Sequence, residues 1–289
     1  MKRLIFNILI LTTIIIMQSC SNKPLELNVM TFNIRLDAES DSLNNWKYRK
    51  DVAAQIIKNY DADIIGAQEV CPNQMQDLKD RLPEYAAIGV GREDGTNGPN
   101  SGESSPLFYK KDKFKELKSG TFWLSETPDV PSMGWDAACR RVATWAVLED
   151  IASGKKFFTV NTHLDHVGQE ARIKGVTLML EKAIEEAEGY PVILTGDFNS
   201  TPTSDVVKYI IDESTPHSLA DSRSLAKNKI DKAGTFHNFG KLSSDQQEYI
   251  DYIFVSKGTE VDKYEVIDDK LDGIFLSDHN PVFAKIIVH

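Results

Sequence analysis

Short stretches in which apolar and polar residues alternate recur along the chain, and this period of two is typical of β-strands. The first stretch begins at Leu25, continues through Leu27 and Val29, and ends at Asn33. Compact apolar runs predict further strands, which lie at residues 62–69, 105–110, 141–149, 155–163, 191–196, 249–255 and 282–288. The pattern therefore predicts a chain rich in strands.

Two longer stretches have the helical period instead. Residues 45–60 and 169–188 place their apolar side chains on one face, and Gly189 suits the C-terminal cap of the second helix. Residues 92–104 and 212–246 are polar and predict loops. Because strands outnumber helices and no Pro/Gly-rich linker interrupts residues 25–289, we predict one domain of two packed sheets with helices outside.

The N-terminal segment has a different pattern. Lys2 and Arg3 precede an apolar run of 14 residues, Leu4–Met17. This run is short for a membrane span and has the length of a signal-peptide core, although a buried helix or a membrane anchor is the alternative. The residues Met17-Gln18-Ser19-Cys20 resemble a bacterial lipobox. We therefore predict a signal peptide over residues 1–20 with a lipidated Cys20, a tether over residues 21–24, and a protein anchored in the bacterial cell envelope and facing the periplasm.

The charge balance bears on the class of ligand. The chain has 33 basic and 43 acidic residues, and residues 1–20 contain two of the basic ones, so the remainder has 31 against 43 and a net charge of −12. A protein that binds a long nucleic acid normally presents a basic surface. The basic residues here form pairs, such as Lys110-Lys111 and Arg140-Arg141, and no longer run. This composition disfavours long nucleic acids as partners.

Two cysteines remain besides Cys20. In an exported protein Cys71 and Cys139 could form a disulfide, and burial as two free thiols is the other interpretation.

Polar residues that a hydrophobic core would exclude stand at the ends of several predicted strands. The motifs are Thr31-Phe32-Asn33-Ile34-Arg35, Gln68-Glu69-Val70, Asn161-Thr162-His163-Leu164-Asp165-His166, Thr195-Gly196-Asp197-Phe198-Asn199, Ile250-Asp251-Tyr252-Ile253 and Ser277-Asp278-His279-Asn280-Pro281. A single such end is common, but six in one chain indicate that the strands converge on a polar pocket.

In this order and spacing the six motifs resemble those of the endonuclease/exonuclease/phosphatase superfamily, over essentially all of residues 25–289. The resemblance implies an α/β fold, specifically a deoxyribonuclease-like, four-layered α/β/β/α sandwich of two mixed sheets. It also implies hydrolysis of a phosphoester bond with Mg²⁺ or Mn²⁺. Such hydrolysis requires a cation to offset the charge of the phosphoryl oxygens, a group that activates water, and hydrogen-bond donors for the transition state.

The resemblance assigns a metal-binding role to three residues. Glu69 supplies the hard carboxylate oxygen that Mg²⁺ prefers, Asn33 helps to hold the ion or its water through its carbonyl, and Asp278 assists. Taken alone, Asn33 would be interpreted as a strand-end turn residue. Arg35 stands where abasic-site endonucleases place a second acidic residue, which disfavours a DNA-repair function.

The catalytic roles come from the same resemblance. Asp197 would activate the attacking water, and Asn199 would stabilise the phosphoryl group. Because the two residues are two positions apart, their side chains point the same way on an extended segment. An ordinary Asx turn is the alternative interpretation of this motif. His163 and His279 would contact the phosphate, and Asp251 would be the carboxylate partner of His279, which favours the imidazolium.

Two further residues are candidates for substrate binding. Arg141 would face inward as a bidentate phosphate ligand, with Arg140 facing away. Glu103 matches a family carboxylate that hydrogen-bonds the histidine at position 163, and a solvated loop glutamate is the alternative. Asp165 and His166 are left open between lining the pocket and lying outside it.

Together these features predict a metal-dependent phosphoric ester hydrolase of the cell envelope, which we expect to be a monomer. A phosphomono- or phosphodiester of a small molecule or a lipid headgroup is the favoured substrate. An extracytoplasmic nuclease is the alternative, and a non-catalytic lipoprotein that binds phosphorylated ligands is a more distant one. We expect specificity to lie in the loops 92–104, 125–139 and 212–246.

Overall fold

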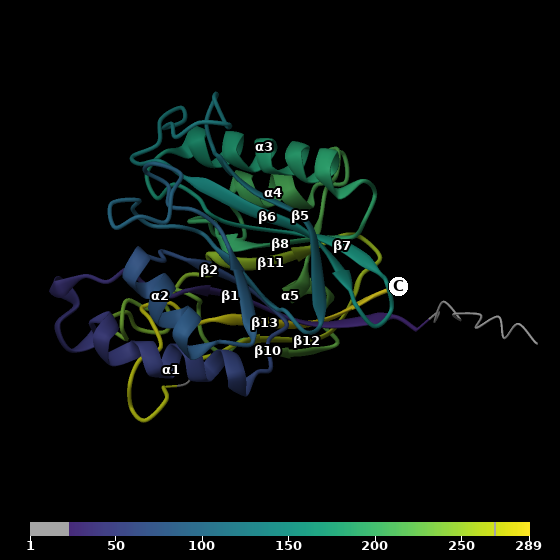
Figure 1. Cartoon of the computed structure of the whole chain (residues 1–289). Helices are drawn as coiled ribbons and strands as arrows, with labels where there is room; N and C mark the ends of the chain where they lie inside the picture. Colours follow the sequence, from purple (N-terminus) through teal and green to yellow (C-terminus); the bar gives the residue numbers. More distant parts are fainter. Residues whose placement is uncertain (1–22, 269) are drawn as a thin grey trace, which may run out of the picture.

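The structure, a computed structural model, describes residues 23–268 and 270–289 (Figure 1). The predicted signal peptide, Cys20 and the first half of the tether lie outside the described residues. Two β-sheets pack face to face and helices cover their outer faces. The seven-stranded sheet contains two parallel pairs, β1–β2 and β10–β12, and the six-stranded sheet contains one, β7–β8, among antiparallel strands, so the predicted four-layered sandwich of mixed sheets is confirmed. Within the described part of the chain, no helix is long and apolar enough to cross a membrane.

One sheet has seven strands in the order β10-β12-β13-β1-β2-β4-β3. Their bounds are β1 Leu25–Asn33, β2 Ile64–Gln68, β3 Tyr85–Ile88, β4 Leu107–Lys110, β10 Asn228–Ile230, β12 Glu260–Val266 and β13 Val282–Val288. The other sheet has six strands in the order β5-β6-β7-β8-β11-β9. Their bounds are β5 Phe114–Trp123, β6 Val142–Asp150, β7 Lys156–His163, β8 Val192–Asp197, β9 Ala220–Asp221 and β11 Asp251–Val255.

The helices lie mainly in the outer layers, apart from the four-residue helix Ser222–Leu225, which contacts β11 of one sheet and β12 of the other. They are the 3-10 helix η1 Glu39–Asn44 and the α-helices α1 Trp46–Asn59, α2 Pro72–Arg81, α3 Gln169–Ala187, α4 Asp205–Ile211 and α5 Ser222–Leu225. Helices α1 and α2 pack on the seven-stranded sheet, and α3 and α4 pack on the six-stranded sheet (Figure 1). A third apolar cluster fills the space between the sheets. The three cores hold the central strands in fixed positions.

Strand register brings the polar strand ends together. In the parallel pair β1–β2, Asn33 lies opposite Gln68, directly before Glu69. In the other sheet Asp197 lies opposite His163 on β7 and opposite Asp251 on β11. The six motifs therefore meet at one end of the sandwich because central strands of both sheets end there.

A buried polar network joins the two sheets beneath this end. The Asn161 side chain on β7 donates to the carbonyls of Ala67 (2.7 Å) and Pro106 (3.0 Å), and it accepts from Gln68 Nε2 (2.7 Å). Gly66 on β2 permits the close approach, because a Cβ there would overlap the side chains of Thr195 and Asn161. The sheets are thus fixed relative to each other by hydrogen bonds as well as by apolar packing.

We expect Gly66→Ala to destabilise the fold by about 1–3 kcal/mol, because the added methyl group overpacks the contact between the sheets. Chemical denaturation would measure the change. Gly98→Ala is the control, because φ is not positive at either glycine and a Cβ at Gly98 meets only the Thr96 hydroxyl within 4 Å. A Gly66→Ala protein as stable as the wild type would contradict this account of the inter-sheet contact.

The structure corrects parts of the predicted element map. The predicted strands and the two predicted helices are present, but residues 212–246 also contain β9, α5 and β10. The strands β3, β5 and β12 and the helices α2 and α4 were not predicted. The residue that caps α3 is Glu188 in a left-handed conformation (φ 49°), one position before the predicted Gly189.

Candidate active site

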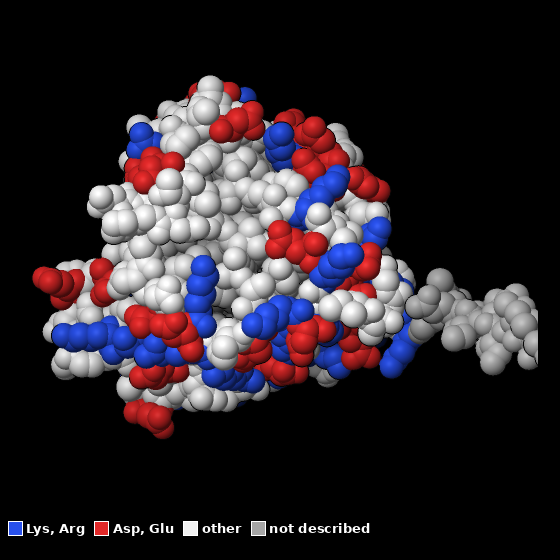
Figure 2. All heavy atoms as spheres, viewed as in Figure 1, with Lys and Arg blue, Asp and Glu red and all other residues white. Residues whose placement is uncertain are grey.

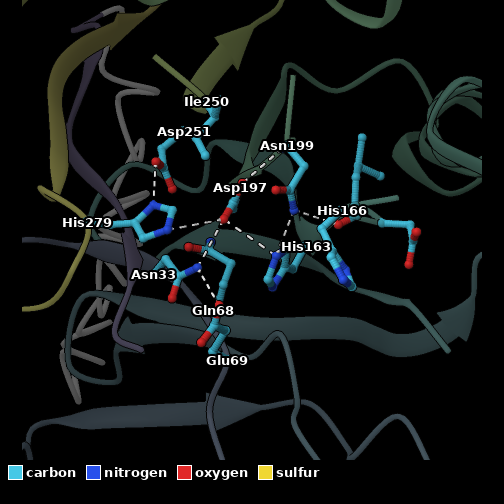
Figure 3. A network of polar contacts seen from close by, with 12 residues as sticks. Asn33, Gln68, Glu69, His163, His166, Asp197, Asn199, Ile250, Asp251 and His279 are labelled. Atoms are coloured by element: carbon cyan, nitrogen blue, oxygen red, sulfur yellow. Dashed lines mark hydrogen bonds and ion pairs between the residues drawn. The ribbon is translucent and has the colours of Figure 1, made fainter. Parts of the chain in front are cut away.

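The six motifs surround a pocket of about 560 Å³. Most residues predicted for the site line it, namely Glu69, Glu103, Arg141, His163, Asp197, Asn199, Asp278 and His279. Asn33 and Asp251 lie directly behind, hydrogen-bonded to residues of the pocket wall (Figure 3). The structure therefore brings all the predicted residues to one place.

Asp197 occupies the centre of this arrangement (Figure 3). Its Oδ2 accepts a hydrogen bond from Asn33 Nδ2 (3.0 Å) and lies 3.5 Å from His163 Nε2 and 3.8 Å from His279 Nε2. Burial and the neighbouring Asp251 carboxylate raise the pKa of Asp197, against the opposing effects of His279 and Asn33. A carboxylate with a raised pKa is a better proton acceptor, as a group that activates water needs to be.

His279 has the carboxylate partner that was expected. Its Nδ1 lies 2.9 Å from Asp251 Oδ2, and both side chains are buried. Burial opposes the charge of the imidazole, but Asp251 and Asp197 outweigh it and raise the pKa of His279 to about 10. His279 is therefore an imidazolium at neutral pH and faces the pocket as a cationic donor.

His163 is in the opposite electrostatic state. Burial and the Arg141 guanidinium hold its pKa well below the usual value, so it is neutral. Asn199 Nδ2 donates to His163 Nε2 (3.0 Å) and to the Leu164 carbonyl (3.0 Å). Among the described residues His163 Nδ1 has no hydrogen-bond partner.

The expected hydrogen bond from Glu103 to His163 is therefore wrong for this structure. Both oxygens of Glu103 instead accept from the Arg92 guanidinium. Arg92 at the start of the same loop competes for the carboxylate, and a charged bidentate pair is stronger than a bond to a neutral imidazole.

The extended geometry expected for Asp197 and Asn199 is also wrong. Asn199 has a left-handed backbone (φ 46°), and its N–H donates to Asp197 Oδ1 (2.9 Å), which is the Asx-turn interaction. Both side chains nevertheless line the pocket.

Two other residues of the site, Arg35 (φ 60°) and Glu69 (φ 61°), have the same strained left-handed backbone as Asn199. Such non-glycine residues cluster where a side chain must be presented at a fixed angle.

Glu69 and Asp278 offer carboxylate oxygens to the pocket, and this donor set fits a hard divalent cation. The Arg35 guanidinium lies 3.9 Å from Glu69 and 3.8 Å from Asp278, so both carboxylates are close to the same positive charge. Asn33 has another arrangement than expected: its carbonyl accepts from the Arg35 N–H, and its amide nitrogen donates to Glu69 (3.0 Å). In this geometry Asn33 orients the carboxylates, and a direct bond to the ion stays a prediction.

A cluster of possible ligand atoms within 4.8 Å of one another is formed by Asp197, Asp251 and His279. Because His279 is protonated and bonded to Asp251, it does not offer a lone pair to an ion. The binding of an ion by Glu69 and Asp278 stays a prediction, and their side chains line the same pocket as Asp197.

Arg141 faces the pocket, as predicted, and Arg140 pairs with Glu93 away from it. The Arg141 guanidinium contacts Asp165 Oδ2 (3.4 Å) and His166 Nδ1 (3.0 Å). Asp165 also accepts from three backbone N–H groups, so it is a buried structural residue, whereas His166 lines the pocket.

Cys71 and Cys139 are free thiols, so of the two alternatives left open by the sequence the structure has no disulfide between them.

Sequence reasoning missed part of the pocket wall. The missed residues are Leu36, Arg92, Phe236, Asn238, Glu248 and Ile250, and Cys139 was considered only for a disulfide. Each of the three loops expected to set specificity contributes at least one lining residue: Arg92 from the first, Cys139 from the second and Phe236 from the third. Their composition indicated loops, but nothing in the sequence indicated which side chain points inward.

Fold and site together define a phosphoesterase of the deoxyribonuclease-like sandwich class. The sequence profile of the Endonuclease/Exonuclease/phosphatase family matches residues 30–279, and the chain belongs to this family. Members of the family are metal-dependent phosphoester hydrolases, and so is this chain.

Known proteins resemble it over most of its length. The endonuclease/exonuclease/phosphatase from Bacteroides vulgatus is 45% identical, with a TM-score of 0.87 and coverage of 92% of this chain and 100% of that one. The mannosyl-6-phosphatase of Bacteroides thetaiotaomicron is 38% identical, with a TM-score of 0.82 and coverage of 90% and 99%. The Ccr4 exoribonuclease subunit of Aspergillus niger is 22% identical over 93% of this chain, which spans about half (53%) of that protein's length.

Proposed function

We propose that this protein is a Mg²⁺-dependent phosphomonoesterase that hydrolyses small, soluble sugar phosphates in the cell envelope. The observation that carries the proposal is the position of Phe236, whose ring lies 4.9 Å from that of His279 in the same pocket. With Ile250 it forms an apolar wall next to the phosphate-facing groups, which suits the apolar face of a sugar ring. The 38% identity to a mannosyl-6-phosphatase supports the same substrate class.

The chain's own residues have distinct parts in this reaction. Asp197, with its raised pKa, accepts a proton from the attacking water, and Asn33 fixes its carboxylate. The His279 imidazolium donates to a phosphoryl oxygen, and Asp251 holds the ring in place. Asn199 donates to His163 and to the Leu164 carbonyl, and it thereby fixes the orientation of the neutral imidazole in the pocket. A divalent ion held by Glu69 and Asp278 would supply a Lewis acid for the phosphoryl oxygens.

The position of β1 favours a soluble substrate over a lipid headgroup. The strand begins at Leu25, beside the C-terminal strand, and ends at Asn33 behind the site. A rise of about 3.3 Å per residue separates the two ends by roughly 26 Å. The proposed lipid on Cys20 is five residue steps away from Leu25, which span at most about 18 Å. An anchored molecule would thus direct its active site away from the membrane that holds it.

Surface charge argues against a long nucleic acid. On the face shown in Figure 2, basic and acidic side chains of the described residues are intermixed, mainly along the lower and right edges, and no continuous basic stripe crosses this face. Together with the net charge of −10, this offers few sites for releasing counterions from a polyphosphate backbone.

A substrate panel tests the proposal. Phosphate release would be measured from mannose 6-phosphate, glucose 6-phosphate, inositol phosphates, phospholipid vesicles, bis(4-nitrophenyl) phosphate and single- and double-stranded DNA, with Mg²⁺ and with EDTA. We expect hydrolysis of sugar phosphates that EDTA abolishes. Preferential cleavage of DNA or of phospholipid would overturn the proposed substrate.

Membrane fractionation of the wild type and of Cys20→Ala tests the proposed anchor. If Cys20 carries the lipid, the variant should move from the membrane fraction to the soluble fraction.

Replacing Glu69 tests the metal site directly. We expect Glu69→Gln to weaken Mn²⁺ binding, measured by calorimetry, by about 10-fold or more, since even residues that only orient metal ligands contribute that much. Glu248→Gln removes a carboxylate from another part of the pocket wall and should bind Mn²⁺ as the wild type does. Equal affinity in Glu69→Gln and the wild type would remove Glu69 from the metal site.

A further inference from the structure

An ion pair in the pocket wall has no part in the mechanism above. Arg92 Nη1 lies 3.0 Å from Glu103 Oε2, and Arg92 Nη2 lies 2.6 Å from Glu103 Oε1, so the planar groups meet as a two-pronged pair. Both residues line the pocket, and they share a small adjoining cavity with His163 and Arg141. The side chains are only 16% and 17% exposed. This pair therefore lies beside the phosphate-facing histidine and is largely screened from bulk water.

The pair is held rigidly. The Arg92 N–H donates to the Glu103 carbonyl (2.9 Å), so the backbone already joins the two residues. Trp123 Nε1 donates to the Arg92 carbonyl (2.7 Å). On the outer side Glu93 lies 3.4 Å from Arg92 Nε and accepts from Arg140 (2.5 Å). A ligand that binds here meets groups already in place and loses little affinity to their ordering.

The pair also keeps hydrogen-bonding capacity. A guanidinium has five N–H donors and a carboxylate accepts about four hydrogen bonds, whereas this ion pair uses two of each. The remaining donors belong to Arg92, and the remaining acceptor positions belong to Glu103. A sugar hydroxyl both donates and accepts, so two neighbouring hydroxyls can bind Glu103 and Arg92 together.

We propose that Arg92 and Glu103 form a subsite that binds neighbouring hydroxyl groups of the substrate's sugar ring while the phosphate lies at His163 and His279. This inference rests on the proposed function and identifies the part of the pocket that distinguishes a sugar phosphate from other monoesters. In the bound state the ring lies between the Arg92–Glu103 pair and the apolar wall formed by Phe236 and Ile250.

Glu93 provides a matched control. It interacts with the same arginine and belongs to the same loop, but it does not line the pocket. If the pair only fastens the loop, Glu93→Gln and Glu103→Gln act alike. If Glu103 contacts the sugar, only its replacement changes the preference for sugar phosphates.

The experiment compares kcat/KM for mannose 6-phosphate with kcat/KM for 4-nitrophenyl phosphate, which has no hydroxyl groups. We expect the ratio to fall roughly 10-fold or more in Glu103→Gln, since hydrogen bonds to charged groups are the strong ones. Arg92→Lys keeps the positive charge but loses the two-pronged guanidinium, so the ratio of the two kcat/KM values should fall in this variant as well. Glu93→Gln should keep the wild-type ratio. An unchanged ratio in Glu103→Gln, or an equal fall in Glu93→Gln, would overturn the subsite.

A binding measurement separates this inference from the proposed function. In an Asp197→Asn background, calorimetry with Mg²⁺ compares mannose 6-phosphate with inorganic phosphate. The subsite requires that the sugar phosphate bind more tightly and that Glu103→Gln remove this advantage, whether or not the wild type hydrolyses the compound. Equal binding of the two ligands to the parent protein would refute the subsite, whereas absent hydrolysis with preferential binding would refute only the phosphatase function.

Discussion

His279→Ala is expected to lower kcat by a factor of about 10² to 10⁴, because it removes a donor that is positively charged at neutral pH and faces the phosphoryl group. The charge results from the buried hydrogen bond to Asp251 and from the nearby Asp197, which raise the pKa of His279 to about 10. Steady-state kinetics on the substrate identified by the panel would measure the loss. The melting temperature of the variant would show whether it is folded.

Asp251 provides the control for this prediction. If Asp251 acts by holding His279, the single variant Asp251→Asn loses activity. The double variant, with Asp251→Asn and His279→Ala together, then loses no more activity than His279→Ala by itself, because the two residues act as a unit. A loss of less than about tenfold in His279→Ala would contradict its role. Multiplicative losses in the double variant would instead assign Asp251 a separate function.

Arg49→Met is expected to destabilise the protein by about 3–5 kcal/mol, the usual effect of breaking a buried charged network. Arg49 on α1 is fully buried and donates to the backbone carbonyls of Ile34 (2.7 Å) and Leu276 (3.0 Å). Ile34 follows Asn33, and Leu276 lies two residues before Asp278. The guanidinium therefore connects the two segments that carry metal-site residues, and its loss leaves buried carbonyls without a donor.

Denaturant unfolding would measure the change in free energy. Arg223→Met is a suitable control, since Arg223 pairs with Asp231 and is partly exposed (30%), and surface pairs contribute about 0–1 kcal/mol. Arg49→Lys keeps the charge but cannot reach the same set of carbonyls, so an intermediate loss is expected. An Arg49→Met protein as stable as the Arg223→Met variant would contradict the bridging role.

The sequence predicted most of the site because strand ends carry strong local signals. An apolar run that stops at Glu69, Asp197 or His163 needs no tertiary information to be noticed, and register then brings these residues together. The predicted sandwich followed from the same strands. What lines the rest of the pocket could not be predicted, because Phe236 and Arg92 lie in loops whose direction depends on tertiary contacts such as the Trp123–Arg92 hydrogen bond.

The missed strands also have a physical cause. Strand β5 has a register shift between Glu116 and Lys118, and β12 has one between Val261 and Lys263. A bulge inserts one residue and reverses the alternation of the faces, so neither strand shows an uninterrupted period of two. Helix α2 offers only Met75 and Leu78 as buried apolar residues, too few for a clear helical period.

The left-handed backbone at Arg35, Glu69 and Asn199 has a consequence for protein engineering. Each of these residues costs about 1–2 kcal/mol relative to a relaxed conformation, and glycine would remove most of that cost. Mutagenesis guided by thermal stability alone would therefore favour glycine at all three positions and would dismantle the catalytic pocket while strengthening the scaffold. Substitutions meant to stabilise this enzyme should therefore be made away from these three turns, in surface loops and helix caps.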